Sequence, residues 1–214
     1  MNSDFVKRMK MESEQKVRSF RLLNRVAKKG ETVFAGSSLM EQFPVNELMI
    51  SRGMPQTVYN RGIGGFTTKQ YLEVLDACVL ELEPSRLFIN IGTNDIGATT
   101  DWKAQLIDTY RKILTTVQTA LPDCRIYVMA YYPVANTGEA FLTPNAAMPR
   151  TLPLVQEANA AVEALAGELG LRFINVNAPI SDETGHMDSQ YAKDPVHMFP
   201  SAYDKILTEL EQYL

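Results

Sequence analysis

The sequence predicts an α/β fold in which a parallel β-sheet is covered by helices on both faces. Short apolar runs alternate with longer segments of helical periodicity, and strands that are buried on both faces have this near-continuous apolar character. The connections from strand to helix are short, as in doubly wound sheets. A chain of 214 residues, 45% of them hydrophobic, suits one domain with a sizeable core. We therefore expect a three-layer α/β/α sandwich with a five-stranded parallel sheet.

The chain opens with Asp4 to Lys29, whose charged and apolar residues follow the period of an amphipathic helix. We expect residues 1–30 to pack as a helix on the domain, with a solvated basic face rather than a lipid contact, and residues 31–214 to form a single domain. The first strand, Thr32–Ala35, is apolar and stops at a glycine, after which a short helix begins near Ser38.

Four further strands and four further helices are expected, each bounded by turn residues. The strands are Thr57–Asn60, Arg86–Ile91, Arg125–Tyr131 and Arg172–Val176. The helices cover about 67–82, 101–120, 154–169 and 202–213. The segment Pro133–Pro149 contains three prolines and is expected to be irregular, because proline removes a backbone donor and restricts its neighbours.

Composition argues against several functional classes. The net charge of −4 gives little electrostatic support for nucleic-acid binding. No segment approaches the roughly 20 apolar residues that span a bilayer, and charges recur through the first 29 residues, so we expect no stable membrane anchor and a cytoplasmic location. Two cysteines and two histidines without a C-x-x-C pair favour neither a disulfide framework nor a structural zinc site. Cys78 and Cys124 are expected to be structural thiols.

A candidate nucleophile follows the first strand, in Gly36-Ser37-Ser38-Leu39. A serine at the start of a helix can present its hydroxyl while the free N–H groups of the first turn face developing negative charge. We assign this role to Ser38, whose own amide can also bind an oxyanion, and treat Ser37 as its rival and as a support of the turn. The alternative for Ser38 is an ordinary helix cap, a position that serine favours.

A candidate base lies near the other end of the chain, in Asp194-Pro195-Val196-His197. A tight loop can bring the Asp194 carboxylate to one imidazole nitrogen, which would fix the tautomer of His197 and stabilise the imidazolium. A local structural cap is the alternative for this aspartate. The second histidine, His186, follows the polar stretch Asp182-Glu183-Thr184-Gly185 and is expected at the surface of a solvated turn.

Polar or glycine-rich features follow the strand ends. Ligands of doubly wound sheets bind beyond the carboxyl ends of the strands, so we expect these features to converge on one edge. Asn94, in Gly92-Thr93-Asn94-Asp95, can donate its amide to an oxyanion while Asp95 braces the loop, and a plain turn is the alternative.

Gly64 and Gly65 follow the second strand and either punctuate a turn or let backbone amides approach a substrate closely. Their stretch lacks the Lys-Ser/Thr ending of a phosphate-binding loop and the spacing of a dinucleotide-binding motif.

Together these motifs resemble the SGNH hydrolase superfamily, also called GDSL-type esterases and lipases, from about Glu31 to the C-terminus. The chain looks most similar to the small members related to the platelet-activating-factor acetylhydrolase catalytic subunits. The family's blocks correspond to Gly36–Leu39, Asn60–Gly65, Gly92–Asp95 and Asp194–His197. The resemblance implies a flavodoxin-like fold, a catalytic triad and an oxyanion hole; the triad would be Ser38, Asp194 and His197, and the oxyanion donors Ser38, Gly65 and Asn94.

The resemblance implies a serine esterase that transfers an acyl group to water without a metal or an organic cofactor. Its expected partner is a small-molecule ester with a short acyl chain such as acetyl, and the resemblance is compatible with a homodimer. A thioesterase or lysophospholipase of the same superfamily is one alternative. A catalytically silent module that binds an ester or a carbohydrate is another.

The chain departs from the family pattern at Ser37, which stands where the family has an aspartate. That aspartate is not a triad member, so the departure bears on substrate preference and rate and leaves the nucleophile assignment unchanged. The irregular segment Pro133–Arg150 is either a movable wall of the acyl pocket, with Phe141 and Leu142 as its apolar members, or a simple surface loop.

Overall fold

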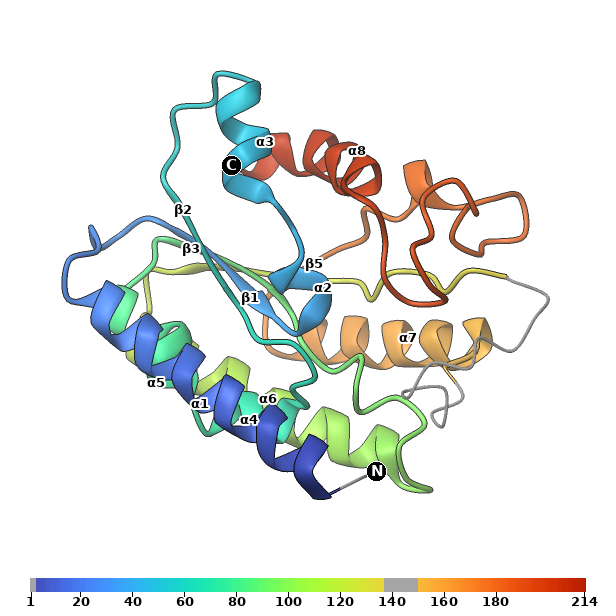
Figure 1. The fold of residues 1–214 in the computed structure, drawn as a ribbon, viewed down its shortest axis with the longest axis horizontal. Helices are drawn as coiled ribbons and strands as arrows, with labels where there is room; N and C mark the ends of the chain where they lie inside the picture. The colour runs from blue at the N-terminus through green and yellow to red at the C-terminus, as the bar shows by residue number, and fades with distance from the viewer. Residues whose placement is uncertain (1–2, 137–149) are drawn as a thin grey trace.

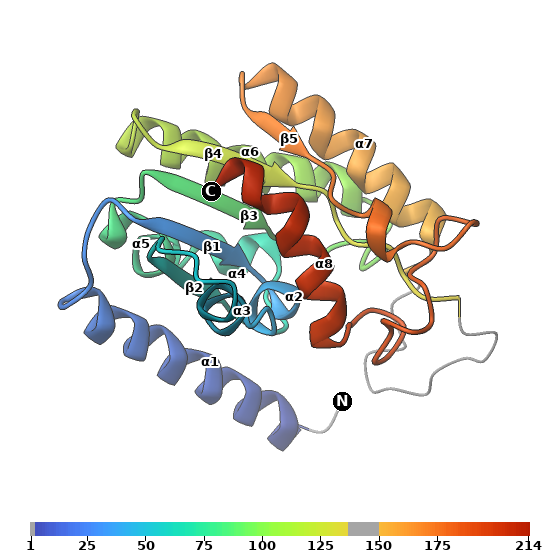
Figure 2. The same ribbon diagram turned by 90° about the horizontal axis from the view of Figure 1, so that it is seen from above.

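All strands of the computed structural model run parallel in one sheet (Figure 1), in the order β2-β1-β3-β4-β5 that is seen in Figure 2. The structure describes residues 3–136 and 150–214. The strands are β1 (Thr32–Gly36), β2 (Val58–Gly62), β3 (Arg86–Asn90), β4 (Arg125–Met129) and β5 (Arg172–Ile174). This sheet confirms the expected fold. Its order changes direction between β1 and β3, the position at which doubly wound sheets bind ligands.

Helices cover both faces of the sheet (Figures 1 and 2). One face packs against α1 (Ser3–Asn24), α4 (Thr68–Leu72), α5 (Leu75–Cys78), α6 (Trp102–Ala120) and α7 (Leu152–Glu168). The other face packs against α2 (Ser38–Glu41), α3 (Val45–Ser51) and α8 (Pro200–Leu210). Short 3-10 helices are η1 (Leu80–Leu82), η2 (Ala178–Ile180) and η3 (Glu211–Tyr213).

A row of aromatic rings organises the core on the α8 face. Phe34, Phe88 and Tyr127 lie in register on β1, β3 and β4, and neighbouring ring centroids are 4.8 Å apart. Phe43, which follows α2, packs edge-on against Phe34 and stacks on Tyr203 of α8 at 4.8 Å. Because aromatic side chains bury large areas, these contacts fix α2 and α8 against the central strands.

Several helical segments differ from the sequence-based expectation. The single helix expected over 67–82 is wrong, because the chain there forms α4, α5 and η1. Val74 and Val79 lie at the interruptions with non-helical backbone angles, and β-branched residues have reduced helix propensity. Helix α3 was not expected.

Helix α1 is held to the sheet by a buried arginine of β2. The Arg61 guanidinium lies over the rings of Phe20 and Tyr59, 4.8 and 5.4 Å from their centroids, and donates to the side-chain oxygen of Asn24 at 2.9 Å. Asn24 in turn donates to the carbonyl of Ala77 at 2.8 Å. α1 ends at Asn24, earlier than expected, where these bonds begin. Among the helices in the described part of the chain, none has the length and apolar character needed to cross a bilayer.

The carboxyl end of β2 touches the helix that follows β1. A Cβ atom at Gly62 would lie 2.6 Å from Cα of Glu41 and 2.8 Å from the carbonyl carbon of Met40. These are backbone atoms, which cannot move aside as a flexible side chain can, so glycine is required at this position. β2 and α2 therefore meet backbone to backbone at the edge where the loops leave the sheet.

Gly62→Ala is expected to lower the free energy of unfolding by about 1–3 kcal/mol, because over-packing against fixed atoms forces a backbone shift. Gly167→Ala is the matched control. A Cβ at Gly167, near the end of α7, meets no atom within 4 Å, so the higher helix propensity of alanine should stabilise this variant by up to about 1 kcal/mol. Denaturant unfolding followed by circular dichroism measures both, and a Gly62→Ala variant as stable as the wild type would contradict the close approach.

Candidate active site

Ser38, His197 and Asp194 form one hydrogen-bonded chain. Ser38 is the first residue of α2, directly after β1, and its Oγ lies 2.9 Å from His197 Nε2. His197 Nδ1 lies 2.7 Å from Asp194 Oδ2. All three residues are partly buried. The structure thus brings together the residues that the sequence suggested as nucleophile, base and orienting acid.

The loop that carries Asp194 and His197 closes on itself. Asp194 Oδ1 accepts hydrogen bonds from the backbone N–H groups of Val196 at 2.8 Å and His197 at 2.7 Å. The His197 carbonyl accepts from the N–H of Lys193 at 2.9 Å. One carboxylate oxygen therefore organises the turn while the other faces the imidazole. Partial burial raises the pKa of Asp194, but the backbone donors and His197 outweigh it, so this pKa lies below its ordinary value.

Two further contacts hold this loop against the segments that follow β4 and β1. The carbonyl of Pro195 accepts from the N–H of Ala135, beyond the end of β4, at 2.9 Å. Helix α8 follows the loop, and the hydroxyl of Tyr203 donates to the carbonyl of Leu39 at 2.7 Å. This buried bond joins the helix after His197 to the helix that begins with Ser38.

The rival serine and the second histidine lie apart from this chain. Ser37 is buried at the N-cap of α2, but its hydroxyl makes no capping bond and has no partner among the described residues. Its carbonyl accepts from the N–H groups of Met40 and Glu41 at 3.1 and 2.9 Å, so Ser37 supports the turn through its backbone. His186 lies in the expected turn, where its Nδ1 is 2.8 Å from Thr184 Oγ1.

The loops after β2 and β3 are joined by Asn94 and Asp95. Asn94 Nδ2 donates to the carbonyl of Phe66 at 2.8 Å, and its second hydrogen makes no bond to any described residue. Asp95 accepts from the hydroxyl and the backbone N–H of Thr68, at 2.7 and 2.9 Å. Burial raises the pKa of Asp95, and the bonds from Thr68 oppose the rise. Asp95 thus braces the loop as expected, by holding the first turn of α4.

The start of α2 and the loop after β2 lie beside each other at this edge of the sheet. A Cβ at Gly64 would lie 3.8 Å from Cβ of Ser38, so the loop after β2 passes beside the serine. Gly65 has a φ of +77°, which favours glycine. Within the described ranges, the backbone N–H groups of Ser38 and Gly65 have no acceptor. With Asn94 Nδ2, these are the three donors that the sequence suggested for an oxyanion hole.

Arg150 was not among the residues expected in the site. Its Nη2 donates to Asn94 Oδ1 at 2.6 Å, which fixes the orientation of the amide so that Nδ2 faces the other way. Burial lowers the pKa of Arg150, and the carboxylates of Asp194 and Asp95 oppose the decrease. The only indication in the sequence is that Arg150 ends the irregular segment Pro133–Arg150. The apolar members of that segment, Phe141 and Leu142, lie outside the described residues.

The cysteines are remote from this chemistry. Burial raises the pKa of both the Cys78 and the Cys124 thiol to about 12, so they are protonated at neutral pH, as structural thiols are. In the part of the chain that the structure describes, no group of three or more His, Cys, Asp and Glu side chains could hold a metal ion.

Comparison with known proteins identifies the family. The sequence profile of the GDSL-like lipase/acylhydrolase family matches residues 34–205. The chain belongs to this family. It is therefore a GDSL-like carboxylic ester hydrolase, and the matched region contains Ser38, Gly65, Asn94, Asp194 and His197. No curated protein matches it in sequence.

Solved structures share the fold of this GDSL-like hydrolase. A protein of Streptococcus pneumonia, provisionally named a platelet activating factor, is 27% identical with a TM-score of 0.87, and the match covers 100% of this chain and 99% of that one. A GDSL-like lipase from Bacteroides thetaiotaomicron is 22% identical with a TM-score of 0.74, over 92% and 98% of the two chains. A Bacteroides fragilis protein, provisionally named an acylhydrolase, is 21% identical with a TM-score of 0.75, over 92% and 94%.

Asp194→Asn is expected to lower the free energy of unfolding by about 1–2 kcal/mol at pH 7, because hydrogen bonds to charged groups are worth about 1.5–3 kcal/mol and the amide keeps part of them. The depressed pKa of Asp194 sets the pH dependence. Its stabilisation is complete above the unfolded-state pKa near 3.9 and is lost as the pH falls through the lower folded-state pKa. The difference from the wild type should therefore shrink below about pH 4.

The control for this prediction is Asp123→Asn, which removes the same charge from an exposed turn before β4. It should change the free energy of unfolding by less than about 0.5 kcal/mol. Denaturant unfolding at a series of pH values measures both variants. A difference for Asp194→Asn that stays constant or grows on acidification would contradict the depressed pKa.

Proposed function

We propose that this hydrolase is a serine esterase for small esters with short acyl chains, such as acetyl esters, and that Ser38 is its nucleophile. The observation that carries the proposal is the chain of hydrogen bonds from Ser38 Oγ through His197 to Asp194, at 2.9 and 2.7 Å. A nucleophile, a base and an acid that orients the base are the groups that this chemistry needs, in this order of contacts.

In the proposed acylation step, Ser38 Oγ attacks the carbonyl carbon of the ester while its proton passes to His197 Nε2. The carbonyl π electrons move to the oxygen and give a tetrahedral oxyanion. When this intermediate collapses, the bond from the carbonyl carbon to the alkoxy oxygen breaks, and His197 gives its proton to the leaving alcohol. Asp194 orients the imidazole through Nδ1 and stabilises the imidazolium between the two transfers.

Water completes the proposed cycle. His197 takes a proton from a water molecule whose oxygen attacks the acyl carbon. The bond between that carbon and Ser38 Oγ then breaks, the carboxylic acid leaves, and Oγ recovers its proton from His197. Every proton is accounted for by these two residues and water.

The oxyanion would be bound by the N–H groups of Ser38 and Gly65 and by the side-chain amide of Asn94. The first two have no acceptor among the described residues, and Asn94 has one N–H hydrogen left after its bond to Phe66. A donor of this kind contributes roughly 3–4 kcal/mol to lowering the barrier. Arg150 supports this role by fixing the orientation of the Asn94 amide.

One feature of the structure favours a substrate with a longer acyl chain, such as the substrate of a lysophospholipase or a long-chain thioesterase. A groove of about 500 Å³ lies between α1, α4 and the loop after β2, and Met9, Val17, Phe66 and Val74 supply its apolar lining beside Gly65. Burial of each methylene of an acyl chain there would add about 0.8 kcal/mol of binding free energy. The residues that line this groove include neither Ser38 nor His197, which supports the short-chain substrate.

Ser38→Ala is expected to abolish hydrolysis of a short-chain aryl ester while the protein stays folded, because no other described hydroxyl contacts His197 Nε2. Ser37→Ala is the matched control. Its hydroxyl has no partner among the residues that the structure describes, so the variant should keep both its stability and most of its activity. Steady-state rates and circular dichroism measure these outcomes, and substantial activity in Ser38→Ala would exclude Ser38 as nucleophile.

A fluorophosphonate label distinguishes the esterase from a silent binding module. The wild type and Ser37→Ala should gain the mass of one label, and Ser38→Ala should gain none. A wild type that remains unlabelled would favour the silent module.

The rate should fall with acyl-chain length if the short-chain proposal is correct. We expect kcat/KM for acetyl and butyryl aryl esters to exceed that for the octanoyl ester by about 10-fold or more, since an extra methylene that does not fit its pocket costs about 1–3 kcal/mol. A matched thioester and a lysophospholipid complete the series. A maximum at octanoyl or with the lysophospholipid would replace the short-chain proposal by the long-chain alternative, and a maximum with the thioester would favour a thioesterase.

A further inference from the structure

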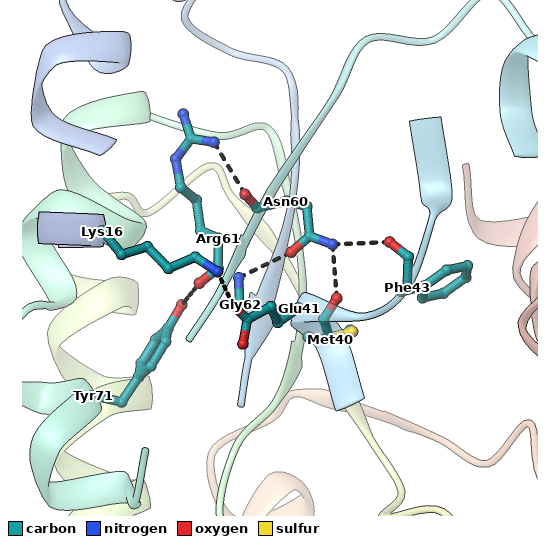
Figure 3. Close-up of polar contacts among 8 residues, drawn as sticks. All are labelled: Lys16, Met40, Glu41, Phe43, Asn60, Arg61, Gly62 and Tyr71. Atoms are coloured by element: carbon teal, nitrogen blue, oxygen red, sulfur yellow. Dashed lines mark hydrogen bonds and ion pairs between the residues drawn. The ribbon is translucent and has the colours of Figure 1, made fainter. Parts of the chain in front are cut away.

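The side chain of Asn60 bridges the two segments that carry the backbone donors of the proposed oxyanion hole (Figure 3). Asn60 lies within β2. Its Nδ2 donates to the carbonyls of Met40 at 2.7 Å and Phe43 at 3.1 Å, and its Oδ1 accepts from the N–H of Gly62 at 2.9 Å. Both amide hydrogens are therefore used at the end of α2, and the oxygen is used at the start of the loop after β2.

Helix α2 needs partners outside itself. It has four residues, and a single helical turn is not stable in isolation, because its nucleation cost is not repaid. The carbonyl of Met40 lies in the turn of α2 and that of Phe43 two residues beyond its end, and Asn60 donates to both. The amide thus fixes the far end of the turn whose first residue is Ser38.

The side-chain oxygen of Asn60 shapes the loop that leads to Gly65. A side-chain oxygen that accepts from the N–H two residues ahead is the bond of an Asx turn, and here it starts the turn at Gly62. The N–H of Ile63 then donates to the carbonyl of Gly36 at 3.0 Å. Gly62 lies in direct backbone contact with Met40. Contacts with α2 and β1 therefore fix the path of the loop.

We propose that Asn60 is a positioning residue that sets the spacing between the N–H groups of Ser38 and Gly65, and so the geometry of the oxyanion hole. This inference rests on the proposed function. None of the hydrogen bonds of Asn60 in the described ranges goes to Ser38 Oγ, His197 or Asp194. Loss of Asn60 therefore perturbs stabilisation of the oxyanion and leaves the proton transfer to His197 as it is.

Asn60→Asp tests this role with almost no change in shape. The carboxylate can still accept from Gly62, but it has no hydrogen for the carbonyls of Met40 and Phe43. A displacement of about 1 Å in a group that acts on the transition state can cost about 100-fold in rate. We expect kcat for an acetyl aryl ester to fall about 10- to 100-fold, KM to change by less than about 3-fold, and the acid limb of the pH–rate profile to stay in place.

Asn175→Asp is the matched control. Asn175 is exposed, follows β5, and accepts from the N–H of Asn177 at 3.1 Å, so it makes the same contact two residues ahead. This variant should have the kcat, KM and pH profile of the wild type. A similar loss of kcat in Asn175→Asp would show that the change of Asn to Asp acts on the protein in general, and would overturn the assignment to Asn60.

Two other results would overturn the positioning role. One is a folded Asn60→Asp protein with the kcat of the wild type. The other is a lowered kcat with a shifted acid limb, which would locate the effect on His197. If Asn60→Asp does not fold, Asn60→Ser is measured against the same outcomes, because its hydroxyl can accept from Gly62 but is too short to bridge to α2. The proposed function fails on other results: a wild type without esterase activity, or a Ser38→Ala variant that retains it. Either of these results would also overturn the positioning role of Asn60.

Discussion

Strands β1, β2 and β3 end at the same level of the sheet, and the rest of the structure depends on this constraint. In the parallel register, Gly36 of β1 lies opposite Gly62 of β2 and Asn90 of β3. The loops that follow therefore leave the sheet side by side, and the proposed nucleophile and the two loop donors come within a few residues of these ends. A slip of one residue in either pairing would turn the strand's side chains to the opposite face. The aromatic row across β1, β3 and β4 resists such a slip between β1 and β3, because its rings stack only when these strands are in register.

The acid and the base reach this edge by a different route. They lie on a loop that is organised by its own carboxylate, so the Asp194–His197 pair is formed locally and then docked as a unit. Docking depends on α8, through the stacking of Tyr203 on Phe43 and the bond of its hydroxyl to Leu39. The sheet register thus sets the positions of the proposed nucleophile and oxyanion donors, and the packing of one C-terminal helix sets the position of the base relative to them.

Residues whose partners lie within one motif could be predicted from the sequence, and those with distant partners could not. Asp194 and His197 are separated by three positions, so their contact is a property of one turn. The rule that ligands bind at strand ends was enough to gather the other candidates at one edge. Arg150 meets Asn94 across 56 residues, and Asn60 meets Met40 across 20, and an isolated arginine or a strand asparagine has no pattern that reveals such a partner. The interrupted helix over 67–82 has a local cause instead: its breaks lie at the β-branched residues Val74 and Val79, whose low helix propensity the apolar pattern alone does not register.

The burial of both cysteines determines how selectively the molecule reacts with electrophiles. Because desolvation raises the pKa of each thiol to about 12, both are protonated at neutral pH. Alkylating agents and oxidants attack the thiolate, so neither sulfur competes with the hydroxyl beside His197. The chain has no other cysteine. Reagents that act on thiolates are therefore expected to leave the chemistry of this edge unaltered.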